Sequence, residues 1–134
     1  MPRTLSLFLI ALPVFLVIDL IWLGVVARRF YRDQLGGLLR TDTVWPAAIA
    51  FYVLFVLGLV VFVLNPAIDD GSLGRAIGLG ALFGLITYAT YDLTNLATLR
   101  DWPPLMTAVD LVWGTVLAAS VSSTTFGIAD ALGV

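Results

Sequence analysis

Four long apolar segments, separated by short polar ones, make up most of this 134-residue chain. They cover about residues 5–27, 46–64, 75–99 and 104–125. A helix needs roughly 20 apolar residues to cross about 30 Å of hydrocarbon, and each segment is close to or above that length. The pattern predicts an all-α integral membrane protein, a four-helix transmembrane bundle formed by one domain over residues 1–134.

Local interruptions refine this prediction. Pro13 lies inside the first segment and predicts a kink or a break there. The polar loop RRFYRDQLGGLLRTDTVW that follows is expected to include a short amphipathic piece on the lipid headgroups. The second segment has no ionisable group and ends at Asn65-Pro66, so we expect it to be a scaffold that faces lipid.

The arginines, which are the only basic residues, predict the orientation. Four of them crowd the first loop and one lies in the third, namely Arg28, Arg29, Arg32, Arg40 and Arg100. Only Arg3 and Arg75 lie on the opposite side. Because loops rich in Arg and Lys stay in the cytoplasm, we expect both termini on the non-cytoplasmic side.

Composition excludes several kinds of site. The chain is 60% hydrophobic and contains no Cys and no His. Disulfides, thiolate catalysis, haem ligation through His or Cys and ordinary zinc sites are therefore excluded, and the cofactor is unknown. Nothing in the sequence indicates nucleic-acid binding, and the expected partners are the lipid bilayer and either a homodimer or a larger membrane complex.

Three aspartates stand out because they interrupt apolar segments at one depth. Asp19, Asp92 and Asp110 each lie seven to nine positions from the loop end of their segment. At about 1.5 Å per residue, all three should lie roughly 10 to 14 Å inside the helices. A charged Asp near a span centre costs on the order of 3 kcal/mol, so we expect the three side chains to point inward.

Residues one helical turn away extend this candidate site. Trp22 and Trp113 each share the face of an aspartate, and Tyr88 and Asn95 lie on the face of Asp92. Gly80 and Gly84 continue that face, where small residues allow a neighbouring helix to approach closely. The predicted ligand-binding or proton-binding residues are Asp19, Asp92, Asp110, Asn95, Tyr88, Trp22 and Trp113.

No basic residue lies inside a span, which leaves several chemistries open. Buried carboxylates without a basic partner can stay protonated, share protons, or hold a cation from outside the chain. Acids flanked by tryptophans suit an organic cation. The three aspartates with Asn95 could also supply oxygen ligands to a hard metal, or the polar residues could simply join helices by hydrogen bonds.

Three pieces of the chain resemble the bacterial family of small predicted membrane proteins catalogued as domain of unknown function 2177. They are FLVIDLIWLGVVARRFYRDQLGGLL, TYATYDLTNLATLRDWP and VDLVWGTVLAASVSS. The resemblance implies a bundle of four helices and no established activity, and with it we expect a multi-pass protein of the bacterial inner (cytoplasmic) membrane. Its characteristic polar positions are Asp19, Trp22, Asp92, Asn95, Asp110 and Trp113.

Three hypotheses follow. The first is a transporter-like or ion-coupled protein whose aspartates bind a proton, a cation or a small polar ligand. The second is a membrane-embedded enzyme that modifies lipids with carboxylates, and it predicts a lateral opening at the depth of Asp92. The third is an accessory or assembly subunit of a larger complex. Because no nucleophile motif, phosphate loop or metal signature is present, we favour a protein that is not an enzyme.

Overall fold

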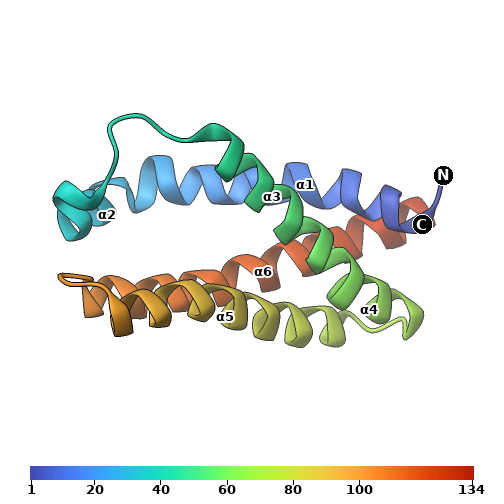
Figure 1. The fold of residues 1–134 in the computed structure, drawn as a ribbon. Coiled ribbons are helices and arrows are strands. Elements are labelled where there is room, and N and C mark those ends of the chain that lie inside the picture. The colour runs from blue at the N-terminus through green and yellow to red at the C-terminus, as the bar shows by residue number, and fades with distance from the viewer.

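The computed structural model describes residues 1–134, and it is built from helices alone (Figure 1). In chain order the elements are α1 (Arg3–Ile21), η1 (Trp22–Val26), α2 (Arg28–Leu35), η2 (Gly36–Leu38), α3 (Trp45–Leu59), η3 (Val60–Leu64), α4 (Asn65–Asp69), α5 (Leu73–Thr98) and α6 (Pro104–Leu132). Elements η1 and η3 are single π-helical turns, and η2 is a short 3₁₀ turn.

Four helical stretches are long and apolar enough to cross a membrane, which confirms the predicted fold class. They cover Arg3–Val26, Trp45–Asp69, Leu73–Thr98 and Pro104–Leu132. The second and fourth stretches end later in the chain than the sequence predicted. The second stretch continues past Asn65-Pro66, because a proline is tolerated in the first turn of α4, where its missing N–H costs little. The fourth continues past residue 125, because its hydroxyl residues Ser122 and Thr125 are buried against neighbours.

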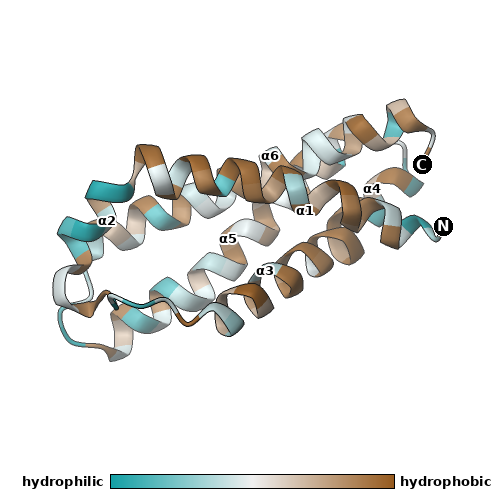
Figure 2. Cartoon of the chain, turned by 90° about the horizontal axis from the view of Figure 1, so that it is seen from above, coloured by the Kyte–Doolittle hydropathy of each residue, from teal (hydrophilic) through white to brown (hydrophobic).

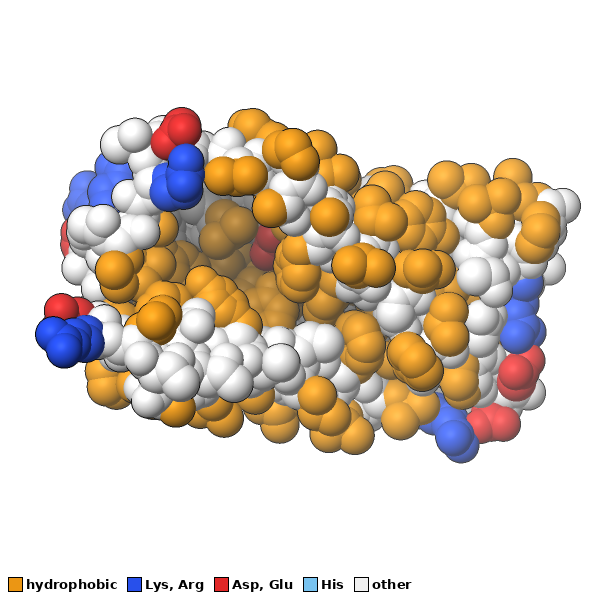
Figure 3. Space-filling model, viewed as in Figure 1, with side chains coloured by type: hydrophobic (Ala, Val, Ile, Leu, Met, Phe, Trp, Pro, Cys, Tyr) orange, Lys and Arg blue, Asp and Glu red, His pale blue; other side chains and the backbone are white.

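The bundle has two chemically different ends. The two termini lie together at one end, which we call the terminal end, and α2 and the α5–α6 loop lie at the other (Figure 1). We call this second end the arginine end, because it holds Arg28, Arg29, Arg32, Arg40 and Arg100. Charged side chains gather at the two ends, and hydrophobic ones cover the surface between them (Figure 3).

The hydrophobic core is concentrated toward the terminal end. Leu7 and Phe15 of α1 pack there with Leu59 of α3, Leu64 of η3 and Leu117 of α6, and all five are fully buried. The expectation that the second span is only a lipid-facing scaffold was therefore wrong. Its outer face is hydrophobic along its length (Figure 2), but its inner face supplies much of the core.

Helices α5 and α6 pack side by side because glycines remove the side chains between them. A Cβ atom on Gly80 would lie 2.6 Å from Ser122 Oγ and 2.9 Å from the Ala118 carbonyl oxygen. A Cβ on Gly84 would collide with the Gly114 carbonyl group. The predicted packing role of Gly80 and Gly84 is confirmed, since only glycine fits at these approaches.

Helix α3 diverges from the other helices toward the arginine end. It converges on them at η3, which contacts α1, α5 and α6, and it stands apart from α1 at its other end (Figure 2). Helix α1 continues through Pro13 without the predicted break. The irregular turn occurs instead at η1, where the Ala27 N–H donates to the Trp22 carbonyl five residues earlier at 2.8 Å.

Polar contacts close the terminal end. Arg3 Nε donates to Asn65 Oδ1 at 3.0 Å, and Asn65 Nδ2 donates to Thr4 Oγ1 at 3.2 Å. Arg3 also forms an ion pair with Asp69 at 2.8 Å. These contacts join α1 to α4, so the second span is fixed at the end where it meets the core.

Candidate functional site

A chain of hydrogen bonds joins η1, α2 and α6 near the arginine end. Trp22 Nε1 donates to the Tyr31 hydroxyl at 3.0 Å, and this hydroxyl donates to Asp110 Oδ1 at 2.7 Å. Trp22 lies in η1, Tyr31 in α2 and Asp110 in α6. The amphipathic helix α2 is thus folded back against the bundle, and its tyrosine reaches an aspartate of a membrane-spanning helix.

The π-helical turn η1 begins at Trp22 and separates α1 from α2. A π-helical turn shifts the side chains after it relative to a regular α-helix, and such turns recur at functional sites. The Trp22 indole stacks on that of Trp113, with ring centroids 4.3 Å apart and planes 7° from parallel. The two predicted tryptophans therefore meet each other across α1 and α6.

The three predicted aspartates come together on the inner faces of α1, α5 and α6. Asp110 lies close enough to both Asp19 and Asp92 for their charges to interact, and Asp19 lies beside the Trp113 indole. Asp92 is only 1% exposed, and no N–H or hydroxyl group donates to either of its carboxylate oxygens, although the Asp110 carboxyl group lies within hydrogen-bonding reach. A buried carboxylate without such a donor is costly, so Asp92 is the least satisfied group of the three.

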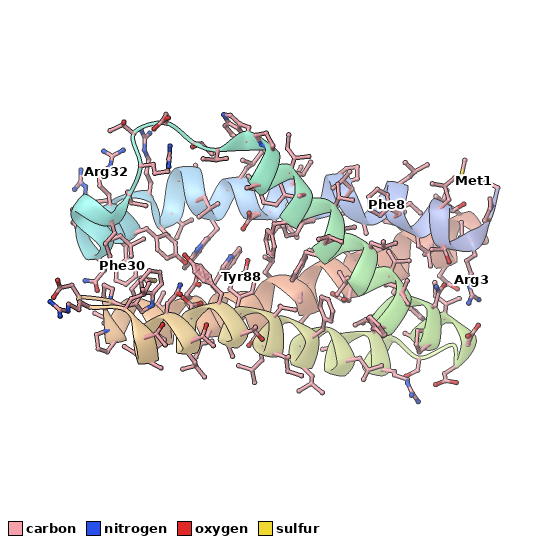
Figure 4. The ribbon with its side chains drawn as sticks, viewed as in Figure 1. Met1, Arg3, Phe8, Phe30, Arg32 and Tyr88 are labelled. Carbon is pink, nitrogen blue, oxygen red and sulfur yellow. The ribbon has the colours of Figure 1, made fainter.

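A cavity of about 570 Å³ lies beside Asp19 and Asp110, and we call it the lateral cavity. Aromatic side chains from three helices line it, among them Tyr52 of α3, Tyr88 of α5 and Trp113 of α6. Tyr88 points from α5 into the interior of the bundle (Figure 4). On the face seen in Figure 3, a hollow with acidic side-chain atoms at its floor opens between α3 and α5. The divergence of α3 leaves this space open.

A second cavity, of about 360 Å³, lies closer to the arginine end, and we call it the end cavity. Asp92 and Asp110 line it together with Arg28 and Arg32 of α2 and with Trp102. The two cavities share part of their lining, including Tyr31, Tyr91 and Asp110. Asp110 therefore borders both cavities, whereas Asp19 lines only the lateral cavity and Asp92 only the end cavity.

The remaining predicted residues are placed unequally. Tyr88 lines the lateral cavity and packs its ring against Gly114. Trp22 lines neither of the two acidic cavities and is tied to them through Tyr31. Asn95 is partly buried on α5 and lines neither cavity. The structure has no group of three acidic side chains placed to hold a metal ion, so the suggested metal site with Asn95 was wrong.

Sequence reasoning missed several residues of this site, all near the first and third loops. Arg28 and Arg32 were interpreted as part of a topology signal and Tyr31 was not singled out, although a spacing of three and four residues places all three on one face of a helix. That spacing was the available signal. Trp102 also belongs to this site, since it is 8% exposed and its Nε1 has no hydrogen-bond partner.

Tyr31 is held in its protonated form. It lies on α2, outside the four candidate spans. Burial and the hydrogen bond to Asp110 both raise the pKa of the Tyr31 hydroxyl above its usual value of 10.0. Burial disfavours the phenolate, and a neighbouring carboxylate repels it. Tyr31 therefore remains a hydrogen-bond donor to Asp110 throughout the physiological range.

Comparison with known proteins identifies a family. No curated protein and no solved structure matches the chain. A family model described as "Predicted membrane protein (DUF2177)" matches residues 4–127, which include all three aspartates and all four candidate spans in nearly their full length. This confirms the resemblance carried by the sequence motifs. The chain belongs to the DUF2177 family of predicted membrane proteins.

Proposed function

We propose that this protein is a ligand-binding, transporter-like membrane protein whose aspartates bind the cationic group of an amphiphilic molecule. The ligand enters the lateral cavity sideways from the bilayer, between α3 and α5. Its cationic group lies near Asp19 and Asp110, and its apolar part lies against the aromatic side chains. Transport requires that the same site also open at the arginine end, where the end cavity lies.

The lateral cavity is the observation that carries this proposal. Its volume of about 570 Å³ falls in the range of cavities that hold small organic ligands. It combines acidic groups with aromatic rings, and ring faces attract cations by about 0.5 to 2 kcal/mol. Most of its lining lies inside the candidate spans, which favours ligands that partition into lipid.

The orientation belongs to the same proposal. The arginine end lies in the cytoplasm of a bacterial cell, because Arg-rich loops are retained there during membrane insertion. The termini then lie on the opposite side of the inner membrane. A reporter enzyme fused to the C-terminus, active only outside the cytoplasm, tests this directly, and activity of a reporter that works only in the cytoplasm would reverse the assignment.

Binding of a lipophilic cation tests the proposed site. The purified protein in lipid nanodiscs is titrated with radiolabelled tetraphenylphosphonium, and saturable binding is expected. Asp19→Asn and Asp110→Asn should each weaken binding about tenfold or more, since a charge attraction in a low-dielectric site is lost. Asp130→Asn is the matched control, because Asp130 is exposed near the terminal end and lines neither cavity.

Two results would contradict the proposal. The first is the absence of saturable binding by a folded protein. The second is an equal loss of binding in the variants Asp19→Asn, Asp110→Asn and Asp130→Asn. Such a result would mean that net charge, and not the cavity, decides binding. Circular dichroism and size-exclusion chromatography of each variant in nanodiscs establish that it is folded.

The lateral opening also supports the second candidate, an enzyme that acts on a lipid. Asp19 and Asp110 would then serve as an acid and base pair at the depth of the opening. Incubation of the protein with labelled lipids, followed by mass spectrometry, separates the two candidates. A lipid changed in covalent structure, and unchanged with Asp110→Asn, would favour the enzyme over the transporter-like protein.

A further inference from the structure

We propose that the end cavity binds a zwitterionic headgroup, in which a phosphate and a primary ammonium group lie close together. The ammonium group binds Asp92 and Asp110, and the phosphate group binds Arg28 and Arg32. This inference rests on the proposed function and adds a second binding position for a cationic group beside the first, with Asp110 common to both cavities. The same chemistry occurs in an aminophospholipid and in free phosphoethanolamine.

Asp92 supplies the first argument. Its side chain lines the end cavity, is 1% exposed, and accepts no hydrogen bond at either oxygen. Asp110 lines the same cavity, and one of its oxygens accepts the hydrogen bond from the Tyr31 hydroxyl. A primary ammonium group carries three donors, so it can satisfy both free oxygens of Asp92 and still reach Asp110.

Two arginines of the same lining supply the second argument. Arg28 and Arg32 come from successive turns of α2 and both line the end cavity. Neither forms an ion pair with any acidic side chain. Trp102 adds a buried indole N–H without a partner on the same lining. Guanidinium and indole N–H groups are the donors that a phosphate group accepts.

The lining of the end cavity carries both charges, and they are not paired with each other. Arg28 and Arg32 line the cavity with Asp92 and Asp110, yet no ion pair joins them across its volume of about 360 Å³. A simple cation would satisfy only the aspartates, and a simple anion only the arginines. A zwitterion satisfies both sets of side chains at once.

The neighbouring lateral cavity fits the same ligand class. The two cavities share Tyr31, Tyr91 and Asp110 as lining residues. A headgroup in the end cavity therefore lies next to a space that opens sideways toward the acyl chains (Figure 3). Arg32 lies on α2 at the arginine end (Figure 4), which is the depth of a lipid phosphate group.

Native mass spectrometry of the full-length protein tests this inference. Protein released from detergent is mixed with phosphatidylethanolamine, phosphatidylglycerol or a diacyl trimethylammonium lipid without phosphate. We expect phosphatidylethanolamine to bind about tenfold more tightly than either of the other two. With Arg28→Gln and Arg32→Gln combined, phosphatidylethanolamine should no longer bind more tightly than the trimethylammonium lipid. With Asp92→Asn, phosphatidylethanolamine should no longer bind more tightly than phosphatidylglycerol.

Arg29→Gln is the matched control, because Arg29 lies on the same helix but does not line the end cavity. It should leave the lipid preference unchanged. A second arm adds free phosphoethanolamine as a competitor. Competition at concentrations near those of the lipid identifies a soluble zwitterion as the ligand, and its absence identifies the lipid; either source supports the inference.

Equal binding of the three lipids, or a preference that the Arg28 and Arg32 substitutions leave unchanged, would overturn the inference. Tetraphenylphosphonium binding distinguishes this failure from failure of the proposed function. A protein that binds this cation through Asp19 and Asp110 but shows no phosphate dependence retains the proposed function alone. A protein that binds neither probe loses both.

Discussion

In the terminal half of the bundle, Gly80 and Gly84 of α5 pack directly against α6, where no further side chain would fit. In the arginine half the same helices carry Asp92 and Asp110 beside open cavities. The first half has a core of fully buried Leu, Val, Ala and Phe side chains. The second half has a buried carboxylate and two buried indoles without hydrogen-bond partners, and the first half has two such hydroxyl groups, on Ser122 and Thr125. Apolar packing is concentrated where the helices converge, and the buried acidic side chains lie where α3 diverges.

Charge follows the same division. At the terminal end Arg3 pairs with Asp69 and Arg75 with Asp70, both at 2.8 Å. At the arginine end Arg40 pairs with Asp42 at 3.4 Å, whereas Arg28, Arg29 and Arg32 of α2 have no such partner. Both arginines of the terminal end are therefore paired, and those of α2 are unpaired. This difference between the halves is what the following substitutions are designed to break.

Gly84→Leu should have the largest effect, because the new side chain would collide with the backbone of Gly114. Overpacking typically costs about 1–3 kcal/mol, and a collision with backbone lies at the upper end or beyond. Gly78→Leu is the control, since nothing lies within 4 Å of a Cβ at Gly78. Thermal unfolding in nanodiscs should show a large loss for Gly84→Leu only. Equal losses would mean that α5 and α6 are not closely packed there.

Phe15→Ala should have the next largest effect, because Phe15 is fully buried in the core and packs against Phe55 with ring centroids 5.3 Å apart. Lipid is itself apolar, so the hydrophobic transfer contribution largely cancels and the lost packing remains, worth about 2 kcal/mol. Phe62→Ala, at a position 68% exposed, is the control. Reversible unfolding in mixed micelles measures both. A comparable loss at Phe62 would contradict the placement of the core.

Tyr31→Phe probes the arginine half. It removes the donor to Asp110 and the acceptor for Trp22, and about 1 kcal/mol of stability is expected to be lost. Because the pKa of Tyr31 is raised by folding, the unfolded state ionises first as pH rises. Stability should therefore fall above about pH 10, and Tyr31→Phe should remove part of this fall. An identical pH profile in the variant would exclude a buried, hydrogen-bonded Tyr31.

Arg75→Gln should have the smallest effect. The Arg75–Asp70 pair is about half exposed, and exposed ion pairs contribute roughly 0 to 1 kcal/mol. The same change should leave lipid binding unaltered, in contrast to Arg28→Gln with Arg32→Gln. Parallel unfolding and lipid-binding measurements on the two variants sharpen the difference between the ends. Loss of lipid preference with Arg75→Gln would show that arginine number, not position, decides binding.

The sequence predicted those features that depend on regular helical geometry. The lengths of the apolar segments predicted four spans, and steps of four residues predicted the packing face of Gly80, Gly84 and Asp92. Both follow from repeats of fixed pitch. The common depth of Asp19, Asp92 and Asp110 was predicted in the same way, and the structure brings these three residues together.

The rest depends on irregular backbone: residue spacing places Arg28, Tyr31 and Arg32 on one face of a helix, but it does not reveal that this face lies against the aspartates. The π-helical turn η1 and the reversal of α2 place Tyr31, Arg28 and Arg32 beside the aspartates, although they belong to a loop by composition. No arginine lies in the middle of a membrane span. The site nevertheless has arginines on its wall, because α2 folds back over the end of the bundle.

Accessibility of single cysteines tests the central contrast most directly, and the chain contains no native cysteine to interfere. Thr87→Cys places a thiol on the lining of the lateral cavity, and Ala118→Cys places one in the closed half. Both are treated with a small methanethiosulfonate reagent in nanodiscs, with and without tetraphenylphosphonium. We predict that Thr87→Cys reacts and is protected by the cation, while Ala118→Cys stays unmodified. Equal reaction of both thiols, or reaction at Thr87→Cys that the cation does not slow, would contradict a ligand cavity confined to the arginine half.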